Sequence, residues 1–314
     1  MRTGRDAGLT ALAPICGMIR FMLSALRQKL MRKAVPAAPA DGKVTLADVL
    51  AKGWMEIWYQ PKIELRTMRL YGAEALVRAR HPERGVLPPG LFLPGASEGD
   101  MRALTEAVIL CALRDWTDFA QNGASLKLAV NTPVSALTSL PITTIVNEER
   151  PAAPNWPGLI LEVTEDEIVR DLQLANEVAD ALKESNCSLA LDDFGAGYSS
   201  IARLKQLPFS ELKIDRAYVI DCNSDRVNAG LCEVFVELAK RFGLKTVAEG
   251  IETSHEAHKL QALGCDVGQG YLYAKPMPKV QLIALLRRRL VGGAPPVPER
   301  KRGLAGLIPC FSKG

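Results

Sequence analysis

Short apolar runs alternate with longer stretches of helical periodicity from about Thr45 to Leu290, and this alternation restricts the fold more than any other feature. Strands that alternate with helices favour a largely parallel sheet. About seven or eight strands in roughly 240 residues are typical of a closed barrel in which helices surround the strands. We therefore predict an α/β fold of the TIM-like (β/α)8 type.

The apolar runs and the helical stretches have boundaries that can be read from the sequence. The expected strands cover residues 55–65, 70–80, 125–131, 158–165, 188–193, 211–215, 244–250 and 266–273. The expected helices cover residues 44–53, 104–119, 171–186, 230–243 and 254–264. A turn at Arg66–Arg69 joins the first two strands. A doubly wound open sheet is the alternative fold, but the glycine fingerprint that usually follows the first strand of such a sheet does not occur in this sequence.

The two ends of the chain differ in composition from the middle. Residues 1–44 read as an extension with a linker, residues 45–290 as the folded domain, and residues 291–314 as a flexible basic tail rich in proline and glycine. The extension contains a charge-free stretch at 7–19. A transmembrane helix needs about 20 apolar residues, so this stretch is short for one. Residues 21–33 mix apolar and basic side chains, as a helix on a membrane surface does.

These ends leave several interpretations open. We favour a partly helical or poorly ordered extension without a membrane role. Weak contact with a membrane surface is the second interpretation, and export or a misplaced start codon is the third. The tail is expected to be solvated and disordered, with a polybasic contact to a membrane or a partner as the alternative.

Charge and cysteine content indicate the cellular compartment and the kinds of partner that the chain can bind. The formal net charge is +4, yet basic residues gather at both ends and the middle of the chain is acidic. An acidic middle argues against a groove for nucleic acid. The 7 cysteines form no CxxC pair, so neither a disulfide framework nor a structural zinc site is expected. We expect a cytoplasmic protein, with a peripheral location at the inner membrane as the alternative.

Polar side chains recur at or near the ends of the predicted strands. They are Glu74, Asn131, Glu162, Asp192, Asp193, Lys213, Asp215, Glu249 and Gln269. In a barrel the carboxyl ends of the strands meet at one mouth, so these groups are expected to converge. A single carboxylate at such a place is more often a helix N-cap, but so many of them in register favour a functional site.

The chemistry of such a site follows from its charges. Carboxylates that lie this close together must take up protons or bind cations. Oxygen ligands with almost no histidine or thiolate suit Mg²⁺ or Mn²⁺ rather than zinc. Two such ions about 3.5–4 Å apart can clamp a phosphodiester and activate water. Asp192 and Asp193 would then be a bridging ligand and a ligand of the second ion, in a site for hydrolysis at phosphorus.

Several longer motifs carry a resemblance to a known family. They are "YQPKIEL", "GAEALVRARHPERG", "LAVN", "LILEVTE", "LALDDFGAGYSSIARLKQLPFSELKID", "TVAEGIET" and "GCDVGQGYLYAKPMP". Residues 55–285 therefore resemble the EAL domain family, the cyclic di-GMP phosphodiesterases of bacteria. The resemblance implies a TIM-like barrel that cleaves one phosphodiester bond of cyclic di-GMP, giving linear pGpG, with two Mg²⁺ or Mn²⁺ ions per active site. We also expect a homodimer.

The resemblance implies roles for the acidic residues of these motifs. The ligands of the first metal ion would be Glu74, Asn131, Glu162 and Asp192. Asp192 would be shared between the two ions, and Asp193 would bind the second. Glu252 would support the metal site.

Other residues are implied to act on water or substrate. Lys213 would contact or activate the attacking water, and Glu249 would contact water, metal or substrate as a second catalytic group. The substrate contacts would be Gln60, Arg78 and Gln269. Arg78 would face a phosphate. Glu165 would anchor the loop after "DDFG", and Asp215 would support the site from behind the ligands.

The chain departs from the usual family sequence in three places. They are "GASEGDM" at 95–101, "NTPVSAL" after Asn131, and Ala196. None of them is a proposed ligand. A non-catalytic cyclic di-GMP receptor or protein-interaction module on an EAL fold is the alternative function, but such relatives typically lack some of the acidic ligands. A nucleic-acid phosphodiesterase could share the metal chemistry, although the acidic middle of the chain argues against it.

Overall fold

The structure is a computed structural model and describes residues 42–164, 172–195 and 209–291 of the chain. Nearly all of the predicted N-terminal extension and C-terminal tail lies outside these ranges, as does Glu165. No helix in the described part of the chain is both long and apolar enough to cross a membrane.

Eight of the described strands close into a barrel. They are β1 (Met55–Glu64), β2 (Leu70–His81), β4 (Lys127–Asn131), β5 (Leu159–Thr164), β6 (Cys187–Phe194), β7 (Phe209–Ile214), β8 (Lys245–Ala248) and β9 (Val267–Gln269). The strands pair in the order β1, β9, β8, β7, β6, β5, β4, β2, and the ring closes because β1 also pairs with β2. Two short strands, β3 (Gly85–Leu87) and β10 (Met277–Pro278), extend the sheet beside β2 and β1. The predicted TIM-like barrel is therefore confirmed.

The first strand runs against the direction of the other barrel strands. β1 is antiparallel to both β2 and β9, whereas the other neighbours in the ring are parallel. The short turn between β1 and β2 is the cause, because a turn of a few residues can join only antiparallel strands. The predicted hairpin is thus present, and it places Gln60 opposite Glu74.

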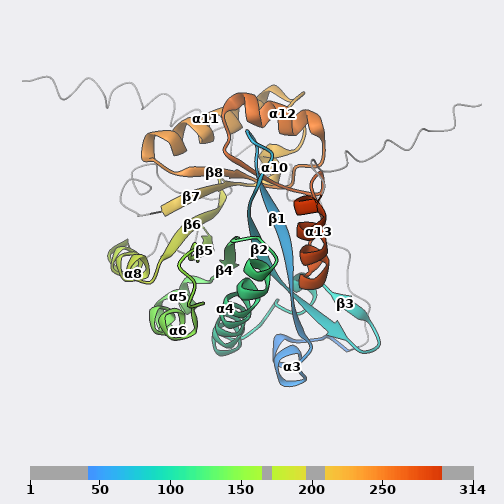
Figure 1. Ribbon diagram of the computed structural model, residues 1–314, viewed down its shortest axis with the longest axis vertical. Helices are drawn as coiled ribbons and strands as arrows, with labels where there is room; N and C mark the ends of the chain where they lie inside the picture. The colour runs from blue at the N-terminus through green and yellow to red at the C-terminus, as the bar shows by residue number, and fades with distance from the viewer. Residues whose placement is uncertain (1–41, 165–171, 196–208, 292–314) are drawn as a thin grey trace, which may run out of the picture.

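Helices surround the barrel on its outside (Figure 1). They are α3 (Leu46–Ala51), η1 (Pro89–Leu91), α4 (Glu98–Gln121), α5 (Val134–Ser139), α6 (Ile142–Glu149), α8 (Leu172–Glu184), α10 (Arg216–Val219), α11 (Arg226–Phe242), α12 (Ser254–Leu263) and α13 (Lys279–Val291). The long α4 begins at Ser97, whose hydroxyl accepts a hydrogen bond of 3.1 Å from the backbone N–H of Asp100. The helix α11 ends at Gly243 in the left-handed conformation that favours glycine.

The main hydrophobic core lies between these helices and the outer face of the barrel. Its largest fully buried side chains include Trp116 and Phe119 of α4. The side chains of Ala129, Ile160 and Ala190 form a separate cluster, in which the two alanines are small. Each of them lies two residues before a predicted ligand on its strand, and therefore on the same face of that strand. The alanines leave room inside the barrel for long polar side chains.

Candidate active site

Lys213 is the centre of the ion pairs at the barrel mouth. It lies on β7 and only 1% of its side chain is exposed. Its Nζ atom is 2.9 Å from Glu162 Oε2, 2.9 Å from Asp192 Oδ1 and 2.7 Å from Glu249 Oε1. Burial alone would lower the pKa of Lys213, but the surrounding carboxylates outweigh it and raise the pKa well above its usual value. Lys213 is therefore an ammonium group that donates hydrogen bonds.

Glu162 lies between two buried ammonium groups. Its Oε2 atom faces Lys213, and its Oε1 atom accepts a hydrogen bond of 2.6 Å from Lys62 Nζ. Burial would raise the pKa of Glu162, but the two lysines prevail and lower it to about 2. Glu162 is thus held as a carboxylate, with one oxygen directed to each lysine.

The buried polar network continues below the mouth. Lys62 Nζ is 3.9 Å from Glu211 Oε2, and the Tyr71 hydroxyl donates a hydrogen bond of 2.6 Å to Glu211 Oε1. Sequence reasoning missed Lys62. The signal was its position two residues after Gln60, which places both side chains on the same face of β1.

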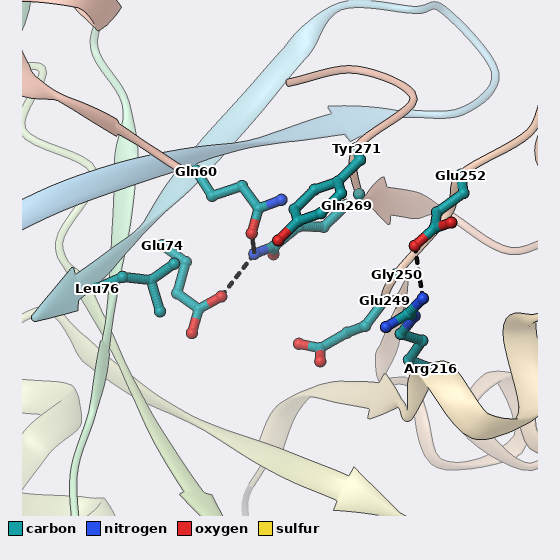
Figure 2. A pocket seen from close by; sticks show the side chains of 10 residues that line it. Gln60, Glu74, Leu76, Arg216, Glu249, Gly250, Glu252, Gln269 and Tyr271 are labelled. Carbon is teal, nitrogen blue, oxygen red and sulfur yellow. Dashed lines mark hydrogen bonds and ion pairs between the residues drawn. The ribbon is translucent and has the colours of Figure 1, made fainter. Parts of the chain in front are cut away.

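Glu74 is held from the other side of the mouth by amide groups. Its Oε1 atom accepts a hydrogen bond of 2.8 Å from Asn131 Nδ2, and its Oε2 atom accepts one of 2.6 Å from Gln269 Nε2. Gln269 Nε2 also donates to Gln60 Oε1 at 3.1 Å, as Figure 2 shows. Burial raises the pKa of Glu74, although Lys213 acts in the opposite direction. Four of the predicted site residues therefore lie in one connected set around this carboxylate.

Asp192, Asp193 and Glu249 form an acidic cluster in which each offers an oxygen within 4.8 Å of the others. Desolvation and the negative charges of Asp192 and Asp215 raise the pKa of Asp193 to about 6. Desolvation also raises the pKa of Glu249 to about 8, although Lys213 opposes it. Asp193 adopts a φ of 52°, a left-handed backbone that is uncommon outside glycine. This backbone strain at Asp193 and the repulsion between the carboxylates both cost free energy, which a bound cation would offset.

The donor set fits hard divalent cations. The atoms offered are carboxylate and amide oxygens, which Mg²⁺ and Mn²⁺ prefer. The two acids with raised pKa values gain most when a cation replaces a proton. Among the described residues, the buried Gln269 Oε1 also has no hydrogen-bond partner, which leaves one more acceptor at the mouth.

The remaining predicted residues lie at the edge of the site. Asp215 accepts a hydrogen bond of 2.8 Å from the backbone N–H of Ala217 and so begins α10. Glu252 forms an ion pair with Arg216 and does not belong to the acidic cluster.

Arg78 lies on the same face of β2 as Glu74, but its NH1 atom donates a hydrogen bond to the backbone carbonyl of Val77 at 2.7 Å. Arg78 is also absent from the lining of the cavity.

A cavity of about 280 Å³ opens at this mouth (Figure 2). Its lining residues are Gln60, Glu74, Leu76, Arg216, Glu249, Gly250, Glu252, Gln269, Gly270 and Tyr271. Sequence reasoning missed Tyr271, Leu76 and Arg216. Tyr271 is 57% exposed and presents a ring at the cavity wall. It lies in the turn after β9, where no strand periodicity applies, so the only signal was its place two residues after Gln269.

A β/α barrel that gathers carboxylates around a buried lysine at the mouth of its strands is the class that this fold and site define. Residues 43–276 match the EAL domain family, and the chain belongs to this family. The membership agrees with the motifs that carry Glu74 and the Asp192–Asp193 pair.

Several relatives have names that state an activity. The cyclic di-GMP phosphodiesterase PA2567 of Pseudomonas aeruginosa is 37% identical over 235 residues, which are 73% of this chain and 40% of the relative. The cyclic di-GMP phosphodiesterase RocR of the same species is 34% identical over 258 residues, which are 82% of this chain and 66% of the relative. The chain thus spans less than two thirds of the length of these relatives.

A solved structure described as "PaMucR Phosphodiesterase, c-di-GMP complex" is also similar to this chain. It is 35% identical with a TM-score of 0.69, and the match covers 76% of this chain and 97% of the other. The barrel and its connections are therefore shared with that protein.

Proposed function

We propose that this chain hydrolyses cyclic di-GMP to linear pGpG with the help of two divalent metal ions. The observation that carries the proposal is the arrangement at Lys213, whose ammonium group joins Glu162, Asp192 and Glu249 at one mouth. Two relatives with more than 30% identity are named cyclic di-GMP phosphodiesterases, which supports the choice of substrate.

The residues that would hold the ions are the carboxylates and the asparagine amide that meet at the mouth. For the first ion we propose Glu74, Asn131, Glu162 and Asp192, and for the second Asp192 and Asp193. When bound, the two ions would polarise the phosphodiester and lower the pKa of a nearby water. The chain's own contribution is to fix the positions of these ligands through Lys62, Lys213 and Gln269.

Two residues are proposed to act on the attacking water. Lys213 is protonated and can donate a hydrogen bond that orients the water oxygen. Glu249, whose Oε1 atom lies 2.7 Å from Lys213 Nζ, can accept a proton from that water. A general base must lie within reach of the proton that it takes, and Glu249 lies beside Asp192 and Asp193, where the ions and the water would be.

Substrate binding is proposed to involve amide groups and an aromatic ring. Gln60 and Gln269 lie on the cavity wall beside Glu74 and can bind polar groups of the nucleotide. The exposed ring of Tyr271 can stack on a base, an interaction worth about 1–3 kcal/mol. Arg78 is proposed to turn from the Val77 carbonyl towards a phosphate when substrate is bound.

The test is a product assay on purified protein with cyclic di-GMP and either Mg²⁺ or Mn²⁺. Wild-type protein is expected to form pGpG, and E74Q and K213M are expected to lose at least about a hundredfold in rate. The control is E237Q, a change in an exposed pair on α11. Absence of pGpG from folded wild-type protein with both metals would overturn the proposal, and binding without turnover would indicate the receptor function instead.

A further inference from the structure

Arg216 and Glu252 form an ion pair on the wall of the cavity. Arg216 is the first residue of α10, and its NH2 atom lies 2.5 Å from Glu252 Oε1. The two side chains are 55% and 43% exposed. In Figure 2 the pair lies on the side of Glu249 that faces away from Glu74. Among the described residues no ion pair joins Arg216 to the acidic cluster.

The stem of Arg216 is held in place by a glycine. A Cβ atom on Gly250 would lie 2.2 Å from Arg216 Cγ and 2.6 Å from Arg216 Cδ. The aliphatic part of Arg216 therefore packs against Gly250 in the space that a side chain at position 250 would need. Gly250 also has a φ of 68°, which side chains rarely adopt. The backbone before the stem is fixed as well, because Asp215 accepts a hydrogen bond from Ala217 N. The guanidinium group is therefore directed at the cavity by its surroundings.

The charge of the cavity gives this guanidinium group a role. Of the described residues that line the cavity, Arg216 is the only cation, whereas Glu74, Glu249 and Glu252 are acids. A cyclic dinucleotide carries two phosphodiesters and thus two negative charges. The phosphate that is cleaved would sit at the acidic cluster with its cations, and Arg216 is the positive group that the described cavity wall offers to the other phosphate.

Arginine is suited to this contact. Its planar guanidinium group binds phosphate oxygens with two parallel hydrogen bonds. The exposed pair with Glu252 contributes little in water, so the exchange of Glu252 for a phosphate is inexpensive.

We propose that Arg216 is a specificity residue that binds the phosphate of the cyclic dinucleotide that is not being cleaved, and that Glu252 is its partner when the cavity is empty. This inference rests on the proposed function, because it concerns the same substrate. It explains why an acid-lined cavity keeps one arginine on its wall.

The experiment compares wild-type protein with R216A, R216K and R241A. Arg241 forms an ion pair of 3.0 Å with Glu237 on α11 and serves as a matched exposed control. Steady-state rates are measured with cyclic di-GMP and Mg²⁺, and the nucleotide Kd is measured by calorimetry with Ca²⁺ in place of Mg²⁺. R216A is expected to raise KM and Kd about tenfold with little change in kcat, because a charge-assisted contact is lost from ground state and transition state alike. R216K is expected to recover part of the loss, and R241A to match wild type.

A model diester with a single phosphate supplies a second comparison. Bis(p-nitrophenyl) phosphate lacks the phosphate that Arg216 would bind, so R216A is expected to cleave it as wild type does. Loss of this activity in R216A would overturn the assignment, because Arg216 would then act at the reacting phosphate. E252Q is expected to bind cyclic di-GMP more tightly, since it frees Arg216 and removes a negative charge. Weaker nucleotide binding by E252Q would contradict the role given to Glu252.

The result for wild type separates this inference from the proposed function. Wild-type protein that neither binds nor cleaves cyclic di-GMP would overturn both. Active wild-type protein with unchanged KM and Kd in R216A would overturn the role of Arg216 alone. Circular dichroism of each variant checks that it is folded. If R216A does not fold, R216K supplies the comparison with wild type.

Discussion

Lys62 and Glu162 form an ion pair of 2.6 Å inside the barrel, where both side chains are 0% exposed. A TIM barrel usually fills this space with branched aliphatic side chains. Here Ala129 and Ala190 are small, and the ammonium group of Lys62 lies among carboxylates instead. The interior of the barrel is therefore stabilised by charges that must match one another.

The first prediction concerns this pair. K62M leaves Glu162 and Glu211 without one buried cation, so we expect the free energy of unfolding to fall by about 3–5 kcal/mol in urea titrations without metal. The matched control is K183M, which breaks the exposed pair between Lys183 and Asp180 and should cost less than about 1 kcal/mol. The double variant K62M/E162L should be more stable than K62M, because it also removes the buried carboxylate that lost Lys62, while Lys213 keeps Asp192 and Glu249 as partners. Equal losses in K62M and K183M would contradict the prediction.

The second prediction concerns pH and metal. Asp193 and Glu249 have folded-state pKa values of about 6 and about 8, above their ordinary values of 3.8 and 4.5. Their contribution to the stability of the metal-free protein is therefore present below about pH 4 and is lost as the pH rises through the folded-state values.

Bound Mg²⁺ replaces these protons, so its effect must grow with pH. We expect Mg²⁺ to raise Tm more at about pH 8.5 than at about pH 5.5. Thermal unfolding at fixed ionic strength measures the difference. D193N should reduce the difference between the two pH values, and an equal rise of Tm at both would be evidence against the raised pKa values.

The sequence allowed the fold and most of the site to be predicted, for physical reasons that can be named. The hairpin from 55 to 80 follows from two apolar runs with a short polar turn. Glu162, Asp192 and Lys213 follow from their places in parallel strands, which must meet at one mouth. Pairs such as Arg216 and Glu252 could not be predicted, because the two residues follow different strands, one in the short α10 and one in a loop, and are 36 residues apart. Lys62 was missed because a lysine in a strand is usually solvated.

The third prediction concerns a carboxylate that holds the loop after β8. Glu256 is 2% exposed, and its oxygens accept hydrogen bonds from the backbone N–H groups of Glu252 and Thr253, both at 2.9 Å, and of Asp221 at 3.1 Å. E256Q replaces an acceptor by an N–H group, so we expect a loss of about 1–3 kcal/mol in unfolding free energy. The KM for cyclic di-GMP should also rise, because the loop carries cavity residues.

The control for this variant is D48A. Asp48 forms a similar capping box with Thr45 in α3 and does not line the cavity. D48A should lower stability slightly and leave KM unchanged. An unchanged KM in folded E256Q would show that the loop does not depend on this carboxylate.

The fourth prediction compares two glycines. A Cβ atom on Gly158 would lie 1.8 Å from the carbonyl oxygen of Asn186, and Gly158 has a φ of 86°. G158A should therefore lose about 3 kcal/mol or more. A Cβ atom on Gly230 in α11 would meet nothing within 4 Å, so G230A should gain about 0.5–1 kcal/mol. Urea titration of both variants measures the difference, and a loss in G230A would contradict the open space beside α11.

The pairing of β1 with β9 has a consequence for how the protein is made. Gln60 of β1 and Gln269 of β9, which are joined by a hydrogen bond between neighbouring strands, are 209 residues apart in the chain. A nascent chain on the ribosome therefore carries β1 with one unpaired edge until β9 emerges. Unpaired strand edges template association between chains. Chains truncated before Val267 are expected to aggregate or to need chaperones. Chains that extend to Gln269 can form β9 and complete the barrel.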